Sequence, residues 1–94
     1  MIIRIVKMTF QPDKVSDFIV LFETRRKTIR DFAGCEQLEL WQDNAQDNIF
    51  FTYSIWNSEA DLNHYRFSDF FKDTWSKTKP MFAAKAEAWS LVKK

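Results

Sequence analysis

The chain has 94 residues, of which 46% are hydrophobic and 17% aromatic, and its 14 basic and 13 acidic side chains leave a net charge of +1. A chain of this length is expected to form one domain, over residues 1–94, and its apolar content excludes intrinsic disorder. The balanced charge provides no strong field that would attract nucleic acid or anionic membranes, so we exclude both as partners.

The first third of the chain predicts a strand followed by a long helix. Residues 2–10 are rich in β-branched and aromatic side chains, which favours a strand that ends before Pro12. Proline is tolerated in a first helical turn, and Gly34, the only glycine, suits a helix C-terminus. Between them, apolar residues recur at helical spacing, at Val15, Phe18, Ile19, Phe22, Ile29 and Phe32.

The middle of the chain predicts a hairpin. Residues 35–42, CEQLELWQ, and residues 48–56, NIFFTYSIW, both have the composition of strands. The polar segment between them, residues 43–48, predicts the connecting turn.

Beyond the hairpin the sequence predicts two short helices and a last strand. Ser58 with Asp61 resembles a capping box, and Ser68 predicts a second helix start. Leu62 and Tyr65 would face inward on the first helix, and Phe71, Trp75 and Thr78 form one stripe on the second, which Pro80 ends. Alternation over residues 86–93 then favours a strand.

The sequence shows no pattern typical of a signal peptide or of a membrane span. Arg4 and Lys7 interrupt any apolar signal segment, and no apolar run approaches the ~18 residues of a membrane span. The single cysteine, Cys35, cannot form an internal disulfide. We therefore expect a cytoplasmic protein.

The resulting βαββαβ order predicts an α+β, ferredoxin-like fold: a four-stranded antiparallel sheet with both helical segments on one face and the second helix broken in two. The strand at residues 48–56 has large side chains on both of its faces. The helices would cover either its odd set, Ile49, Phe51, Tyr53 and Ile55, or its even set, Phe50, Thr52, Ser54 and Trp56.

The sheet face that the helices leave open is expected to form a dimer interface. Several rings left in water would forfeit about 1.5 to 3 kcal/mol each. We therefore predict a homodimer whose two sheets pack face to face. The alternative is an exposed surface of modest apolar character.

The segment FFTYSIWNSEADLNHYRFSDFFK, residues 50–72, resembles the antibiotic biosynthesis monooxygenase family of dimeric α+β barrels. The step from Gly34 to Cys35, the spacing from Trp56 to Leu62 and the run from Ser68 to Phe71 carry the resemblance. It implies a dimer and, in each subunit, a cavity between sheet and helices. Some members oxidise hydroquinone-like or polycyclic aromatic substrates without a cofactor, and others degrade haem.

The residue inventory argues against a metal or a nucleotide cofactor. The chain has one histidine, His64, one cysteine and one glycine, which leaves no His- or Cys-based metal centre and no phosphate-binding loop. We expect no cofactor and no metal. A cofactor-free oxidation requires only an apolar pocket that binds an ionised phenol or anthrone, together with one base at most.

Aromatic and hydroxyl side chains are the candidates for such a pocket. The resemblance implies an aromatic at the position of Trp56, where an indole could wall a flat substrate or donate its N–H to it. Tyr65, Phe71 and Trp75 share a helical face that is expected to look into the same cavity. The predicted catalytic residues are Trp56, Thr52 and His64, and the predicted substrate contacts are Tyr53, Tyr65, Phe71 and Trp75.

A purely structural explanation stays open for each of these residues. Trp56 could be a core tryptophan, and an aromatic stripe at helical spacing most often forms core. His64 is adjacent to Tyr65 and therefore points about 100° away from it, toward the rim or the solvent.

Some positions depart from the family pattern. Small oxidase-like members carry a glutamate and two histidines where this chain has Ser54, Tyr65 and Phe70, and quinone-forming members carry an asparagine where it has Thr52. The haem-degrading branch has a histidine near Trp75, and indole cannot ligate iron. The haem-degrading branch also has an asparagine on its first strand, at a position that falls near Ile5 or Val6 of this chain, so that amide is absent here as well. Haem degradation is therefore the least expected activity.

Three functions remain open from the sequence. The first is a cofactor-independent monooxygenase for a small, hydroquinone- or anthrone-like aromatic. The second is a non-catalytic binder of flat apolar ligands, and the third is a structural dimeric domain with a filled core.

Overall fold

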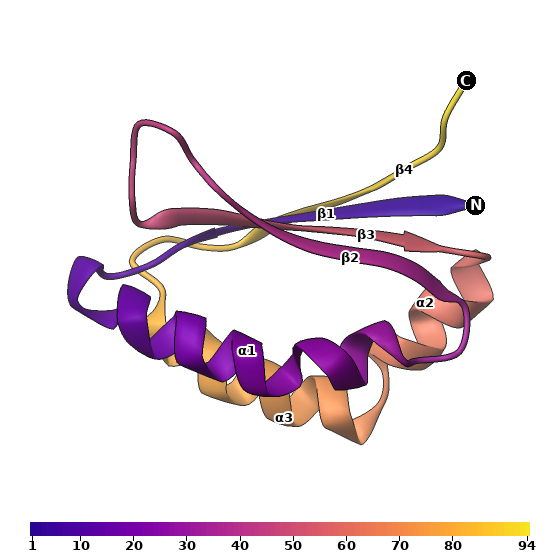
Figure 1. Cartoon of the computed structure of the whole chain (residues 1–94), viewed down its shortest axis with the longest axis horizontal. Coiled ribbons are helices and arrows are strands. Elements are labelled where there is room, and N and C mark those ends of the chain that lie inside the picture. Colours follow the sequence, from indigo (N-terminus) through magenta and orange to yellow (C-terminus); the bar gives the residue numbers. More distant parts are fainter.

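A four-stranded sheet with all helices on one face forms the framework of the chain (Figure 1). The computed structural model describes residues 1–94. Its strands and helices are, in order, β1 (Ile2–Thr9), η1 (Pro12–Lys14), α1 (Val15–Arg30), β2 (Cys35–Gln42), β3 (Ile49–Trp56), α2 (Glu59–Arg66), α3 (Asp69–Thr78), η2 (Lys79–Met81) and β4 (Glu87–Leu91). The strands lie in the order β2-β3-β1-β4, and every neighbouring pair is antiparallel. The predicted ferredoxin-like fold is confirmed.

The break in the second helical segment has a local cause at Ser68. Its hydroxyl donates to the Tyr65 carbonyl at 2.6 Å and accepts from the Phe71 N–H at 3.1 Å. One side chain thus closes the end of α2 and caps the start of α3. Ser58 caps α2 in the same way, since its hydroxyl accepts from the Asp61 N–H at 3.1 Å. Both predicted helix starts are confirmed.

The register of β1 and β3 determines which side chains face the helices. Ile2 pairs with Trp56, Val6 with Thr52, and Met8 with Phe50. Directly paired residues lie on the same face, so the even-numbered residues of both strands point toward the helices. The buried core lies on this inner face, in two clusters: Met8, Phe10, Phe18, Phe22 and Phe50, and Cys35, Trp56 and Leu62.

The opposite, outer face of the sheet has no covering element within the chain (Figure 1). Apolar side chains from all four strands lie on it: Ile3, Ile5, Trp41, Phe51, Tyr53, Ile55, Trp89 and Leu91. Trp41 stacks on Tyr53 with ring centroids 4.8 Å apart, yet it remains 43% exposed. Trp89 and Leu91 on β4 are 44% and 47% exposed.

None of the helices combines the length and the apolar character that crossing a membrane requires.

The helix predicted to run up to Gly34 ends earlier, at Arg30. Beyond it, the Phe32 N–H donates to the Ile29 carbonyl, so the chain tightens into a turn before β2 begins.

Gly34 closes this turn in a conformation that other residues rarely adopt. Its φ is +85°, and a Cβ at this position would collide with the side chain of Asp61 at the start of α2. Its carbonyl accepts a hydrogen bond from the Asn57 N–H at 2.8 Å. The turn after α1 is thereby held closely against the segment that leads into α2.

We predict that Gly34→Ala lowers the free energy of unfolding by about 1–3 kcal/mol, because both the backbone strain and the collision with Asp61 oppose it. Urea denaturation measures the effect. The exposed neighbour offers a control, Ala33→Ser, which should stay within about 0.5 kcal/mol of the original chain. An unchanged midpoint for Gly34→Ala would contradict the conformation described for this turn.

Candidate functional site

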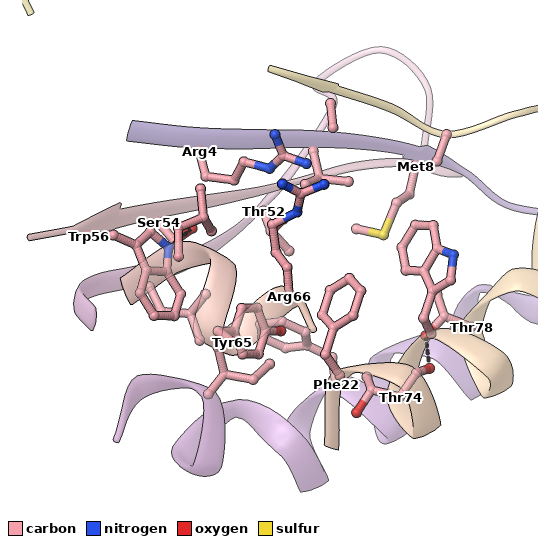
Figure 2. A pocket seen from close by; sticks show the side chains of 18 of the residues that line it. Arg4, Met8, Phe22, Thr52, Ser54, Trp56, Tyr65, Arg66, Thr74 and Thr78 are labelled. Carbon is pink, nitrogen blue, oxygen red and sulfur yellow. Dashed lines mark hydrogen bonds between the residues drawn. The ribbon is translucent and has the colours of Figure 1, made fainter. Parts of the chain in front are cut away.

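A cavity of about 400 Å³ lies between the inner face of the sheet and the helices (Figure 2). Strand residues form its roof, and residues of all three α-helices form its floor and sides. Five of the seven predicted site residues line it: Thr52, Trp56, Tyr65, Phe71 and Trp75. The sequence therefore identified most of the aromatic lining, whose functional roles stay predictions.

The aromatic lining is a continuous series of ring contacts. Tyr65 stacks on Trp56 at 5.1 Å between centroids, with an interplanar angle of 18°. Phe71 meets Tyr65 edge to face at 5.1 Å, and Trp75 stacks on Phe71 at 5.9 Å. Because these rings support one another, they form a preorganised apolar wall of the kind that binds flat molecules.

Trp56 borders the cavity from within the core. The residue is fully buried, and it packs in one cluster with Cys35 and Leu62. Its indole N–H donates to the Ser54 hydroxyl at 3.0 Å. The N–H that was expected to bind a substrate is thus already satisfied by the protein, which favours a structural role for this ring.

Tyr65 is the aromatic with a free polar group. None of the side-chain hydrogen bonds involves its hydroxyl, and since every fully buried side-chain polar atom has a partner, this oxygen is not fully buried. Burial raises the pKa of this hydroxyl well above its usual range, and the nearby Cys35 thiol adds a smaller contribution in the same direction. The phenol is therefore neutral at physiological pH and available as a hydrogen-bond donor to a ligand.

Two predicted site residues do not reach the cavity. Tyr53 was expected to contact substrate, but the pairing of β1 with β3 places it on the outer face, where it stacks on Trp41. His64 was included as a candidate base, but it is exposed on α2, with its ring 6.2 Å from that of Phe32. The placement of Tyr53 is a correction, whereas the exposed position of His64 agrees with the expectation that it points toward the rim or the solvent. Each placement follows from the period of its element: two residues per repeat in the strand and about 100° per residue in the helix.

The sequence interpretation missed two arginines that line the cavity. Arg4 comes from β1 and Arg66 from the last turn of α2, and both line the cavity. In Figure 2 the Arg4 side chain runs along β1, and that of Arg66 extends from α2 toward the sheet. The pKa of Arg4 lies below its usual range, mainly because of burial and also because of the positive charge of Arg66. Alternation could have identified Arg4, which has the same parity as Val6 and Met8 on the inner face.

Other polar groups complete the lining. Thr52, Ser54, Thr74 and Thr78 contribute hydroxyls. Glu87 is the only acidic residue of the lining, and its pairing with Lys7 on β1 turns its side chain to the outer face. The Thr78 hydroxyl donates to the Thr74 carbonyl at 2.8 Å. Nowhere in the chain do three or more His, Cys, Asp or Glu side chains gather in a way that could hold a metal ion.

An ion pair fixes the helices beneath the cavity. Arg25 on α1 donates to the Asp73 carboxylate at 2.8 Å and to the Thr74 hydroxyl at 3.1 Å, both on α3. Arg25 also lies over the ring of Phe70, 5.5 Å from its centroid. These contacts hold α3, and with it Phe71 and Trp75, in place beside α1.

Known proteins share both the sequence pattern and the fold. The family model described as antibiotic biosynthesis monooxygenase matches residues 1–77. The uncharacterised protein sll1783 of Synechocystis sp. is 29% identical over 77 residues, which are 82% of this chain and 52% of that protein. The chain thus spans about half the length of this curated relative.

Solved structures match over nearly the whole chain. A conserved protein from Methanosarcina mazei Go1 has a TM-score of 0.93 at 24% identity, over 100% of this chain and 94% of that one. An antibiotic biosynthesis monooxygenase has a TM-score of 0.93 at 14% identity, over 100% and 99%. Rv0793 from Mycobacterium tuberculosis has a TM-score of 0.90 at 16% identity, over 99% and 94%. At these identities the structures show a shared fold, and the family model, which spans most of the sequence, shows that this chain belongs to the antibiotic biosynthesis monooxygenase family.

Proposed function

We propose that the chain is a cofactor-independent monooxygenase that oxidises a small aromatic of the hydroquinone or anthrone class in the cavity between sheet and helices. The observation that carries this proposal is the cavity of about 400 Å³ with its series of stacked rings. Family membership supports the reaction class.

The proposed reaction requires the substrate to supply the electrons itself. Once an anthrone has lost a proton, its electron-rich anion can transfer an electron to dioxygen. The methylene carbon then loses two hydrogens and gains one oxygen atom as a carbonyl, and the second oxygen atom leaves with those hydrogens as water. The protein has to bind the ring system, orient it and stabilise the oxygen anion.

Tyr65 is the residue best suited to stabilise that anion. Its hydroxyl is protonated at neutral pH, as in any tyrosine, and burial raises its pKa further. No hydrogen bond within the protein competes for it. Thr52, on strand β3, lines the same cavity, and its hydroxyl would be a second hydrogen-bond donor to the anion. The lining contains no histidine, so we assign the departing proton to solvent water rather than to a side-chain base.

Oxygen uptake with anthrone tests this proposal. We expect uptake above the buffer rate and one ¹⁸O atom from ¹⁸O₂ in the product. Tyr65→Phe should lower the turnover about tenfold or more, because a hydrogen bond to a charged group is worth about 1.5–3 kcal/mol. It should affect melting little, because the hydroxyl has no protein partner to lose.

Tyr53→Phe is the matched control, since it removes the same hydroxyl from the outer face, where Tyr53 stacks on Trp41. It should leave turnover unchanged. Uptake no faster than in buffer across a panel of anthrones and hydroquinones would refute the enzymatic proposal.

A non-catalytic binder of the same flat ligands is the second candidate. It is favoured by a lining that has no histidine and only one acidic residue, the exposed Glu87, whose pairing with Lys7 turns its side chain to the outer face. Such a protein would gain about 2.7 kcal/mol of stability at a ligand concentration of 100 Kd without consuming oxygen.

We further propose that the chain forms a homodimer through the outer face of the sheet. This face lies on the side of the sheet opposite the cavity. The three partly exposed side chains there, Trp41, Trp89 and Leu91, lie with the other apolar residues of this face and with the charged residues Lys7, Glu39 and Glu87. No other element of the single chain covers this face (Figure 1). A face-to-face contact of two such sheets has the composition of a stable interface, which buries about 800 Å² per partner.

Sedimentation at micromolar concentration should therefore give twice the chain mass. Phe51→Glu should shift the protein to the monomer or unfold it, because Phe51 lies between Lys7 and Trp41 on the outer face. Val20→Glu is the control, because Val20 is 65% exposed on α1, away from the sheet. Equal sedimentation of the original chain and the Phe51 variant, both folded, would exclude this interface.

Trp56→Phe separates a core role of this tryptophan from a catalytic one. We expect a loss of about 1–3 kcal/mol in the free energy of unfolding, because the substitution leaves a void and removes the hydrogen bond to Ser54. Trp75→Phe, at a half-buried site in the lining, should cost less. Unchanged melting together with reduced turnover would instead identify Trp56 as a residue that contacts the substrate.

A further inference from the structure

Two arginines lie at the same cavity without an acidic partner. The chain forms four ion pairs, which involve Arg25, Arg26, Lys27 and Lys77 as the cations. Arg4 and Arg66 appear in none of them, although both line the cavity. Glu87 is the only acidic residue of the lining, but its pairing with Lys7 turns its side chain to the outer face, and it forms no ion pair with either arginine.

The hydrogen bonds that these arginines do make leave most of their donors unused. Arg4 donates through Nη1 to the Ser90 hydroxyl at 2.9 Å, and Arg66 donates through Nη1 to the Asn63 side-chain oxygen at 3.4 Å. Both acceptors are neutral. A guanidinium has five N–H donors, so each group retains several that can bind another molecule.

The two positive groups also lie close enough to repel each other. In Figure 2 the guanidinium ends of Arg4 and Arg66 lie next to each other beside β1. The pKa of Arg4 is lowered by burial and by the charge of Arg66. An anion bound between them would remove this repulsion and restore the charge-assisted hydrogen bonds that partly buried guanidiniums require.

The shape of the group that fits follows from the chemistry of arginine. A guanidinium presents a planar fork of donors that matches the two oxygens of a carboxylate. The rings of Tyr65, Phe71 and Trp75 form the adjacent wall, in which Phe71 meets Tyr65 edge to face and stacks on Trp75, and this apolar wall suits a flat hydrocarbon body. A cavity of about 400 Å³ lies within the range that accommodates such a molecule.

We propose that Arg4 and Arg66 together bind the carboxylate of an aromatic acid whose ring system lies against the wall formed by Tyr65, Phe71 and Trp75. This inference rests on the proposed function in that the same cavity serves as the substrate site, and it specifies the substrate class as an acidic aromatic. It does not depend on turnover.

Matched probes test the proposal directly. 2-Naphthoate and 2-naphthamide have nearly the same shape, and only the first carries a charge at pH 7. Titration calorimetry should show that 2-naphthoate binds at least tenfold more tightly than 2-naphthamide, the preference expected of hydrogen bonds to a charged group.

Variants of Arg4 and Arg66 test whether these two side chains cause the preference for the charged probe. Arg4→Gln and Arg66→Gln should each reduce the naphthoate-to-naphthamide ratio severalfold while leaving the affinity for naphthamide nearly unchanged. Arg26→Gln is the matched control: it removes the same charge from α1, where Arg26 pairs with Glu23, and should keep the full ratio. Thermal melting verifies that each variant is folded.

The comparison of the two probes on the original chain tests the carboxylate site even if a variant fails to fold. Equal affinity for the two probes, or binding of neither, would overturn the carboxylate site. A preference that is lost equally in Arg26→Gln would overturn the assignment to Arg4 and Arg66. Because calorimetry needs no oxygen, a positive binding result with no oxygen uptake would reject the enzymatic function and retain this inference.

Discussion

The antiparallel register between β1 and β3 is the constraint on which the rest of the molecule depends. Pairing Ile2 with Trp56 and Met8 with Phe50 turns the even residues of both strands toward the helices. A slip of one residue would turn one of the two strands over relative to the other. Turning β1 would remove Arg4 from the cavity, and turning β3 would remove Thr52 and replace the buried Trp56 by its neighbour Ile55. The core, the cavity and the proposed dimer surface therefore share one geometric origin.

The interruption at Ser68 is the second determinant of the site. A continuous helix would keep Tyr65 and Phe71 on one straight axis, whereas the break lets α2 and α3 approach the sheet separately (Figure 1). Tyr65 can then stack on Trp56 while Phe71 meets Tyr65 edge to face. Arg66, next to Tyr65, also reaches the cavity from the last turn of α2. A single capping serine thus positions both the aromatic and the charged parts of the lining.

The fold was predictable from the sequence because local and periodic signals agreed. The helix starts at Ser58 and Ser68 were confirmed as caps, and the order of strands and helices followed from their apolar spacing. The orientation of β3 was not predictable, because large side chains occupy both of its faces and alternation alone does not say which face the helices cover. Tyr53 was consequently assigned to the cavity, although it lies on the outer face.

The charged lining was missed for a different reason. In a strand of apolar residues, an arginine is usually attributed to solvent, and Arg66 near a helix C-terminus is explained by the helix dipole alone. Only the tertiary structure shows that both side chains line one cavity. The aromatic wall, by contrast, was predicted from Tyr65, Phe71 and Trp75 because helical spacing is a local property.

The balance of charge in the cavity links the two proposals. A bound carboxylate would compensate one of the two guanidinium charges and leave the other uncompensated, since neither arginine forms an ion pair within the protein. In an apolar cavity, the remaining positive charge favours the ionised form of a phenol or an anthrone. The neutral Tyr65 hydroxyl can donate a hydrogen bond to the same developing anion. A pocket without a histidine base can thus promote ionisation of its substrate by stabilising the anion rather than by accepting the proton.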